Sequence, residues 1–151
     1  MGVAVSKVGI IGAGMMGAEI ALCFSMSGRE VAMKDATLEL AQKGKHRLED
    51  LLDKAVQKGR FQAKDKDATL SRITPTDQYE AFKDVGLIVE AVFEDLDTKR
   101  DIFTQLDTIC KQDCILATNT SSIPITLLAS SVKSERRGQF LGAHFFLLLL
   151  S

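Results

Sequence analysis

Three glycines within residues 12–17 (GAGMMG) lie between a short β-branched run, Lys7–Ile11, and a stretch whose apolar residues recur at helical spacing. A GxGxxG sequence that joins a strand to a helix is typical of a dinucleotide-binding βαβ unit. In such a unit Gly12 permits the tight turn, Gly14 lets a pyrophosphate approach the backbone, and Gly17 lets helix and strand pack closely. The motif therefore predicts a βαβ start to the fold and a nucleotide cofactor at its first turn.

The start of the predicted helix, at Met15 and Met16, is where the cofactor phosphates are expected to bind. Backbone N–H groups are unpaired there, and the positive end of the helix dipole attracts anions. The alternative interpretation is a glycine-rich turn that binds no ligand. The position of the motif between a strand and a helix favours the cofactor.

Asp35 follows the second predicted strand, 31–33, at the distance from the glycines that a ribose-binding acid occupies in this motif. A carboxylate there accepts hydrogen bonds from the adenosine ribose and repels a 2′-phosphate, and no arginine follows it. The sequence therefore predicts NAD rather than NADP. Lys34 is expected to point to the opposite side, because side chains alternate along a strand. In the alternative interpretation Asp35 is only a turn residue.

The rest of the chain alternates predicted strands with predicted helices. The polar stretch 59–67 is expected to be a loop. Strands are expected from Ile73 and at 86–92, 114–117 and 140–143, and helices at 15–26, 37–58, 77–82 and 97–110, with a short helix near Pro124. Strands connected through helices in this order predict a Rossmann-type α/β fold, a doubly wound and mainly parallel sheet with helices on both faces.

The composition and the charge exclude several classes of function. Basic and acidic residues nearly cancel (19 against 20) and aromatic residues are 6%, so neither nucleic acid nor an anionic membrane is an expected partner. The apolar run 140–150 is too short and too interrupted to cross a bilayer, and residues 1–12 do not form a signal peptide. The three cysteines fit neither a disulfide framework nor a zinc site, and no metal is expected. They indicate a reducing compartment, the cytoplasm or, in a eukaryote, the mitochondrial matrix.

Polar residues follow three further predicted strands at the point where each strand ends. Glu94 comes after 86–92, residues 119–122 (NTSS) come after 114–117, and His144 ends the last strand. Each could be structural on its own, as a helix-start acid, as caps of a short helix or as a hydrogen-bonded histidine. Because the carboxyl ends of parallel strands meet at one edge, where α/β sheets bind ligands, the sequence predicts a shared site.

Four segments in this order resemble the NAD-binding domain of the L-3-hydroxyacyl-CoA dehydrogenases: KVGIIGAGMMGAEIA, LIVEAVFEDLDTKRDIF, ATNTSSIPIT and GAHFF. The resemblance covers residues 6–146. It is most similar to the dehydrogenase portion of multifunctional fatty acid β-oxidation proteins, and a stand-alone 3-hydroxybutyryl-CoA dehydrogenase is the other option. It implies an NAD-dependent oxidoreductase that converts L-3-hydroxyacyl-CoA to 3-oxoacyl-CoA.

The resemblance implies catalytic roles for two side chains. His144 matches the family's catalytic base, which takes the 3-hydroxyl proton while hydride leaves C3 for the nicotinamide. An imidazole suits this role because it titrates near neutral pH. Ser121 matches the serine that hydrogen-bonds the 3-oxygen of the substrate.

The resemblance also implies binding contacts. Glu94 and Lys99 match contacts to the nicotinamide side of the cofactor, and Asn119 is a further expected cofactor-binding residue. Lys54 and Lys58 on the long second helix are candidates for contact with coenzyme A, because that helix touches coenzyme A in the family. The expected partners are therefore an acyl-CoA substrate and, in the parent protein, a second copy or a multienzyme complex.

The sequence departs from the family after HFF, where the family has Asn-Pro or Ser-Pro and this chain has Leu147 and Leu148. The glutamate that orients the catalytic histidine is missing, and so is the C-terminal helical domain that closes over the acyl chain. We therefore expect an NAD-binding domain at 1–146 and an atypical tail at 147–151, a truncation or a non-native end. Without the orienting carboxylate, this chain is expected to bind cofactor far better than it catalyses.

Two other functions remain open from the sequence. The first is another NAD-dependent dehydrogenase of a hydroxy acid, against which the NTSS and GAHFF segments argue; binding of coenzyme A would distinguish it. The second is a non-catalytic nucleotide-binding module, which the missing carboxylate and the missing domain favour for this chain, though not for its parent.

Overall fold

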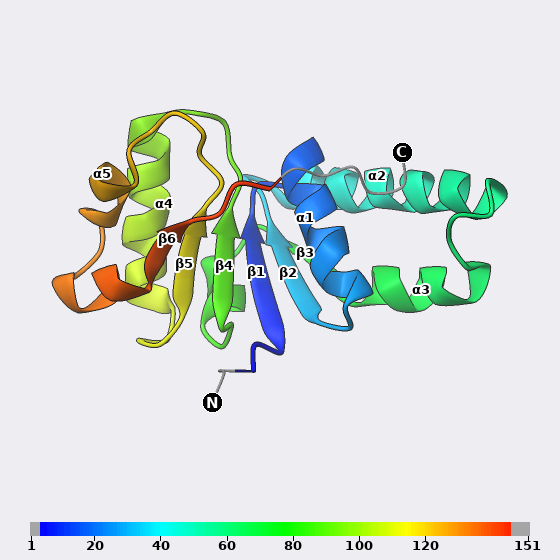
Figure 1. Cartoon of the computed structure of the whole chain (residues 1–151), viewed down its shortest axis with the longest axis horizontal. Helices are drawn as coiled ribbons and strands as arrows, with labels where there is room; N and C mark the ends of the chain where they lie inside the picture. Colours follow the sequence, from blue (N-terminus) through cyan, green and yellow to red (C-terminus); the bar gives the residue numbers. More distant parts are fainter. Residues whose placement is uncertain (1–3, 146–151) are drawn as a thin grey trace.

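Six strands form one parallel sheet in the part of the chain that the computed structural model describes, residues 4–145. The strands are β1 (Lys7–Ile11), β2 (Glu30–Lys34), β3 (Ile73–Thr76), β4 (Leu87–Glu90), β5 (Ile115–Thr118) and β6 (Phe140–Gly142). Their order is β3-β2-β1-β4-β5-β6, and every neighbouring pair is parallel (Figure 1). The chain builds outward from β1 in one direction, returns to the centre at β4, and continues in the other. The predicted doubly wound, Rossmann-type fold is therefore confirmed.

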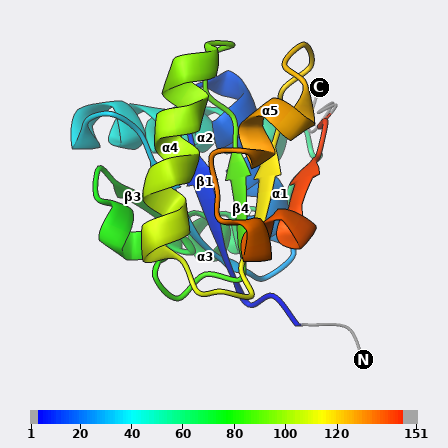
Figure 2. The same cartoon turned by 90° about the vertical axis from the view of Figure 1, so that its left-hand side faces the viewer.

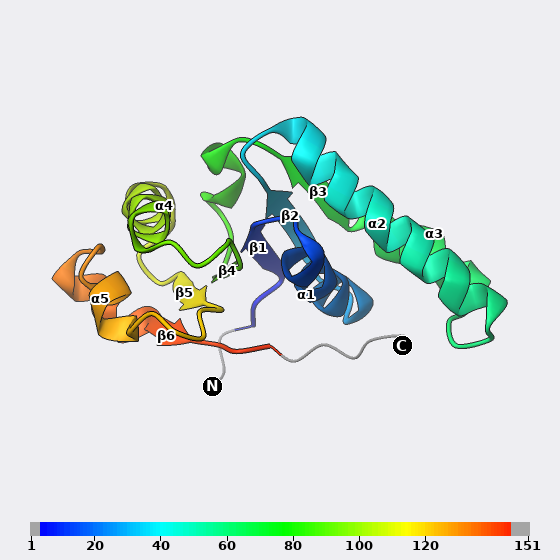
Figure 3. The same cartoon turned by 90° about the horizontal axis from the view of Figure 1, so that it is seen from above.

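Helices cover both faces of this sheet (Figure 3). One face carries α1 (Met15–Met26), α2 (Leu38–Gln57) and α3 (Ala63–Ser71), and the other carries α4 (Leu96–Ile109) and α5 (Ile125–Ala129), which lie in front of the sheet in Figure 2. Two 3₁₀ turns complete the described elements, η1 (Tyr79–Phe82) and η2 (Ser134–Gln139).

Successive residues of β1 belong to different cores. Ile10 lies in the core that contains Ile20 of α1 and Leu52 of α2, whereas Ile11 lies in the core with Phe103 of α4. Because helices bury both faces, the strand is a continuous apolar run rather than an alternating one.

Helix α3 corrects the expectation of a polar loop at 59–67, because residues Ala63–Ser71 are helical. Most of its side chains are exposed, so no apolar stripe marked it as a helix in the sequence. One of the alternating charges attaches this helix to a neighbouring one, since Lys66 forms an ion pair with Asp53 of α2.

The carboxyl ends of the strands meet at one side of the sheet, the upper side in Figure 1, which we call the carboxyl edge. The loops that follow β1, β4, β5 and β6 all run along it. No helix within residues 4–145 is both long and apolar enough to cross a membrane. The predicted tail, 147–151, lies outside the described residues.

Candidate active site

The glycine loop connects β1 to α1 and is held by close backbone contacts. Gly12 has φ +102°, and its N–H donates to the carbonyl of Lys34 at 2.8 Å. A Cβ at Gly17 would lie 1.7 Å from the Gly12 carbonyl oxygen, so helix and strand could not approach with any larger residue there. A Cβ at Gly14 would meet no atom within 4 Å. The loop is thus tightly packed at Gly12 and Gly17 and open at Gly14. Gly14 lies beside the N-terminus of α1, where Met15 and Met16 lie.

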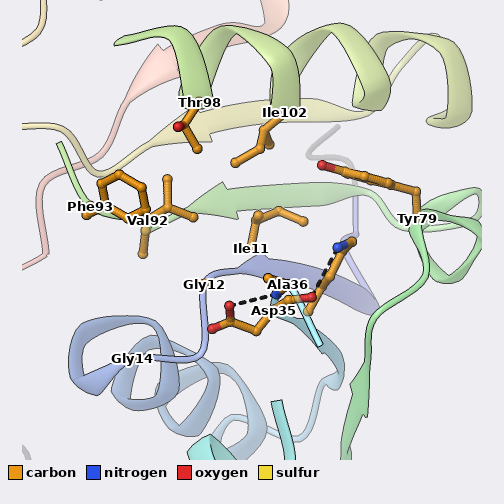
Figure 4. Close-up of a pocket in the computed structure, with 12 residues that line it drawn as sticks. Ile11, Gly12, Gly14, Asp35, Ala36, Tyr79, Val92, Phe93, Thr98 and Ile102 are labelled. Carbon is orange, nitrogen blue, oxygen red and sulfur yellow. Dashed lines mark hydrogen bonds between the residues drawn. The ribbon is translucent and has the colours of Figure 1, made fainter. Parts of the chain in front are cut away.

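A cavity of about 460 Å³ opens beside this loop (Figure 4). Asp35 and Ala36 lie on one side of it, and Thr98 and Ile102 of α4 lie on the other. The lining is mostly apolar and comes from the glycine loop, the carboxyl ends of β1 and β2, η1, the loop after β4, and α4. The lining residues are Ile11, Gly12, Gly14, Lys34, Asp35, Ala36, Tyr79, Ala91, Val92, Phe93, Thr98 and Ile102. Its position, outside β1 and β4 where the strand order reverses, is where doubly wound sheets bind nucleotides.

Asp35 connects the loop to the segment that leads into α2. Its carboxylate accepts hydrogen bonds from the N–H of Ala13 at 2.8 Å and from the N–H of Ala36 at 2.7 Å. A carboxylate has about four acceptor positions, so two remain for the hydroxyls of a ribose. Asp35 therefore anchors the glycine loop as well as lining the cavity, a role that its position in the sequence did not suggest.

Lys34 lines the same cavity, and the expectation that it points to the opposite side is wrong. Its ammonium donates to the Asp35 carbonyl at 3.1 Å and lies 4.5 Å from the centre of the Tyr79 ring. Alternation failed here because Lys34 is the last residue of β2, where the strand ends and the chain turns. Its long side chain folds back onto the Asp35 carbonyl and the Tyr79 ring.

Beyond β4, Lys99 is held between two carboxylates. Its ammonium lies 2.6 Å from Glu90 and 3.2 Å from Glu94, and it also donates to the Val92 carbonyl at 3.1 Å. Lys99 and Glu90 have no exposed surface. The structure therefore places Lys99 behind Glu94, so that Glu94 is the member of this group that faces solvent. Glu90 was not among the residues predicted for the site, although an acid that ends an otherwise apolar strand (LIVE) is a usable signal.

Glu94 also holds the loop that follows β5. One of its oxygens accepts hydrogen bonds from the Thr120 and Ser122 hydroxyls, each at 2.6 Å. Partial burial raises the pKa of Glu94, but the hydrogen bonds from Ser122, Thr120 and Lys99 outweigh it and lower the pKa to about 2. Glu94 is therefore a carboxylate at all ordinary pH values.

Asn119 joins the β5 loop to the segment that carries His144. Its side-chain oxygen accepts a hydrogen bond from the N–H of Phe145 at 2.9 Å, and its own N–H donates to the Glu90 carbonyl at 2.8 Å. The neighbouring Ser121 and His144 are both exposed at the carboxyl edge. The structure thus brings the two predicted catalytic residues onto segments that Asn119 holds together.

The two lysines predicted to contact coenzyme A lie on α2. Lys54 lines a second hollow of about 250 Å³, between α1 and α2, together with Met15 and Arg47. Lys58 caps the C-terminus of the same helix. Among residues 4–145, no cluster of three or more histidine, cysteine or acidic side chains is arranged to hold a metal ion, and the three cysteines are free thiols.

The sequence of this chain is similar to those of known dehydrogenases. Residues 7–147 match the family model described as 3-hydroxyacyl-CoA dehydrogenase, NAD binding domain. A 3-hydroxybutyryl-CoA dehydrogenase of Clostridioides difficile is 43% identical over 140 residues, which are 93% of this chain and 49% of that protein. A glyoxysomal fatty acid beta-oxidation multifunctional protein of Brassica napus is 37% identical over 142 residues, 94% of this chain and 19% of that protein.

Solved structures agree with these sequence matches. The crystal structure of (S)-3-hydroxybutyryl-CoA dehydrogenase from Ralstonia eutropha superposes with a TM-score of 0.89 at 37% identity, covering 95% of this chain and 50% of that one. The chain therefore spans about half the length of the stand-alone relatives and a fifth of the multifunctional one.

Proposed function

The chain belongs to the 3-hydroxyacyl-CoA dehydrogenase family, of which it contains the NAD-binding domain, and on this premise we propose that it serves an enzyme that oxidises L-3-hydroxyacyl-CoA to 3-oxoacyl-CoA. We assign residues 1–146 to this domain. NAD, when bound, supplies the acceptor for the hydride that leaves C3 of the substrate. The residues of this chain bind and orient the two reactants and accept the hydroxyl proton.

The residues at the carboxyl edge fit a dinucleotide. The 460 Å³ cavity, between Asp35 on one side and α4 on the other, suits the adenosine half, with Asp35 offering acceptors to the ribose. The space above Gly14, beside the N–H groups at the start of α1, suits the pyrophosphate. The nicotinamide half is then assigned to the β4–β5 side, toward Glu94 and Asn119.

The observation that carries the proposed chemistry is the hydrogen bond from the Phe145 N–H to Asn119. It holds the backbone beside His144 against the loop that presents Ser121. We assign His144 as the proton acceptor for the 3-hydroxyl and Ser121 as a hydrogen-bond donor to the same oxygen, since a positioned base and a donor at one oxygen are what this oxidation needs.

The coenzyme A moiety is assigned to the α1–α2 side, where Lys54 and Lys58 supply positive charge for its phosphates. For the parent protein we infer a helical domain that covers the acyl chain, and assembly as a homodimer or within a multienzyme complex. The multifunctional protein of Brassica napus is consistent with the second arrangement. The three free thiols favour a reducing compartment, the cytoplasm or the mitochondrial matrix.

The test is oxidation of 3-hydroxybutyryl-CoA by the full-length protein, followed by the absorbance of NADH. The proposal expects turnover with NAD and the thioester, and none with a free 2-hydroxy acid. Turnover of a free hydroxy acid without coenzyme A would contradict the proposed substrate. NADH binding without turnover of any of these substrates by the full-length protein would indicate a non-catalytic module.

A further inference from the structure

Glu90, Lys99 and Glu94 form a group that we call the β4–α4 charge cluster. Two carboxylates share one ammonium, so the cluster carries a formal charge of −1. Glu90 and Lys99 have no exposed surface, and the Glu94 side chain is 38% exposed. Two members of the cluster are therefore shielded from solvent by the protein, and the excess negative charge reaches the carboxyl edge through Glu94.

Hydrogen bonds at both oxygens fix Glu90. One oxygen accepts from Lys99 at 2.6 Å and from the Val92 N–H at 2.7 Å, and the other accepts from the Thr118 hydroxyl at 2.6 Å. The members of the cluster come from β4, the loop after it and α4, and Thr118 of β5 also donates to Glu90, so the cluster is held from several elements at once.

The oxidised and reduced cofactors differ at this end of the site. The nicotinamide ring of NAD⁺ carries a positive charge, and the ring of NADH is neutral. The adenosine half is assigned to the Asp35 side of the reversal point, so the nicotinamide lies toward β4 and β5. The single charge that distinguishes the two cofactor forms is therefore placed near the β4–α4 charge cluster.

We propose that Glu90 is a positioning residue that fixes Lys99 and leaves one uncompensated negative charge beside the nicotinamide, so that the site favours NAD⁺ relative to NADH. This inference rests on the proposed function for the direction in which the dinucleotide lies. A buried, paired carboxylate acts through two effects here: it neutralises Lys99, and it thereby leaves the charge of Glu94 free to act on the cofactor. The Glu90–Lys99 pair is buried and poorly screened, whereas Glu94 is partly exposed, so we expect its effect on the cofactor to be modest.

The hydrogen bonds of Glu94 support this role. They lower the pKa of Glu94 to about 2, so Glu94 keeps its negative charge over the whole working pH range. The neighbouring Asp95 is engaged elsewhere, since its carboxylate caps α4 by accepting from the Thr98 N–H at 2.8 Å.

The decisive variant is Glu90→Gln, which removes the charge and keeps the shape. The amide oxygen can accept from Lys99 and Val92, and the amide nitrogen can donate to the Thr118 hydroxyl, which also accepts hydrogen bonds. Dissociation constants for NADH and NAD⁺ are measured on the 151-residue chain by fluorescence titration and by competition. We expect NAD⁺ binding to weaken about three- to tenfold relative to NADH binding. A purely structural role would weaken both forms equally.

Two further variants separate charge from folding. Glu94→Gln removes the same charge at a partly exposed position, and it should shift the NAD⁺ to NADH ratio in the same direction even if Glu90→Gln does not fold. Asp113→Asn removes an exposed carboxylate at the opposite end of β5 and should leave the ratio unchanged.

The outcomes distinguish this inference from the function on which it rests. A shift for both Glu90→Gln and Glu94→Gln, without one for Asp113→Asn, supports the inference, and a shift for Glu94→Gln beside an unchanged ratio in a folded Glu90→Gln chain overturns the role of Glu90. Binding of both cofactor forms with an unchanged ratio in the Glu variants overturns the inference alone. If the unaltered chain binds neither form, the proposed function fails and the inference fails with it.

Discussion

At the scale of single residues, Asp35 combines two tasks that a substitution can separate. Asp35→Asn keeps an acceptor oxygen for only one of the two N–H groups that the carboxylate binds, those of Ala13 and Ala36, and it removes the charge that repels a 2′-phosphate. We expect the unaltered chain to bind NADH at least about ten times more tightly than NADPH, and Asp35→Asn to narrow this gap while lowering the melting temperature modestly. Fluorescence titration with both cofactors measures it.

Lys34 provides the control for this experiment. Its ammonium lies in the same cavity, so it is the cation available to a 2′-phosphate once Asp35 is neutral. Adding Lys34→Met to Asp35→Asn should remove the gained NADPH affinity. Equal affinities for NADH and NADPH in the unaltered chain would refute the role given to Asp35.

For His144, the expected effect concerns turnover in the full-length enzyme. His144→Gln should lower kcat and kcat/KM by about 10²–10⁴, the usual contribution of a positioned base, and leave NADH affinity almost unchanged. Ser121→Ala should cost less, because it removes one hydrogen bond and leaves the base in place. Loss of NADH binding together with turnover would mean that His144 has a structural role.

A site residue could be predicted from the sequence when its position relative to a strand was enough to place it. The glycines, Asp35 and Asn119 follow strands, so their place at the carboxyl edge was predictable from the strand pattern alone. The place of Glu90 at the end of an apolar strand was also readable, but its pairing with Lys99 and the true direction of Lys34 were not, because side-chain pairing across elements depends on how α4 and η1 rotate against the sheet. A linear pattern carries no information on that rotation.

At the scale of elements, the loops after β4 and β5 are joined by an interaction that depends on pH. Glu94 has a pKa of about 2 in the folded chain against an ordinary value of 4.5. A lowered pKa stabilises the fold above pH 4.5, and this stabilisation is lost as the pH falls toward 2. Because the side chain is 38% exposed, we expect a loss of only about 1–2 kcal/mol.

Unfolding by urea between pH 7 and pH 2 tests this expectation. Glu94→Gln should be less stable than the unaltered chain at pH 7, and the two should converge as the pH approaches 2. Parallel pH curves for the two proteins would show that the Thr120 and Ser122 bonds contribute no pH-dependent stability.

Arg136 holds the C-terminus of α4 through several side-chain contacts. This buried guanidinium contacts the Asp107 carboxylate at 2.6 Å and the carbonyls of Lys111 and Cys110 at 2.7 and 3.1 Å. Arg136→Met leaves a buried carboxylate unpaired and should lower the free energy of unfolding by about 3–5 kcal/mol. The neighbouring exposed residue is the matched control, since Arg137→Met should stay within about 0.5 kcal/mol. Similar losses in both variants would contradict this account.

At the scale of the whole molecule, apolar side chains remain exposed around the carboxyl edge. Phe93 at the mouth of the cavity is 72% exposed, and Met15 at the start of α1 is 70% exposed. Exposed apolar surface of this kind promotes association. We expect light scattering to show that the 151-residue chain forms oligomers as its concentration rises. The double variant Phe93→Ser, Met15→Gln should form fewer oligomers at the same concentration. A monomer at high concentration would contradict the expectation.

The overall architecture was the most predictable level. A glycine motif in a βαβ start, followed by strands alternating with helices, permits few topologies, because crossovers between parallel strands are right-handed. The sequence failed at α3, whose polar surface shows no helical periodicity of apolar residues and whose attachment is an ion pair with α2. Elements that bury little apolar area leave little trace in a hydrophobic pattern.

The segment at 143–145 also has a consequence for the order in which the chain assembles. It runs from β6 back across the sheet, where the Phe145 ring meets Phe24 of α1 at 6.4 Å and the Phe145 N–H meets Asn119. Contacts between residues so distant in sequence form late, since closing a long loop costs entropy that only an already folded sheet can offset. His144 lies within this segment. We therefore expect this segment, with the residue proposed as the proton acceptor, to become ordered late in folding, after the central strands have paired.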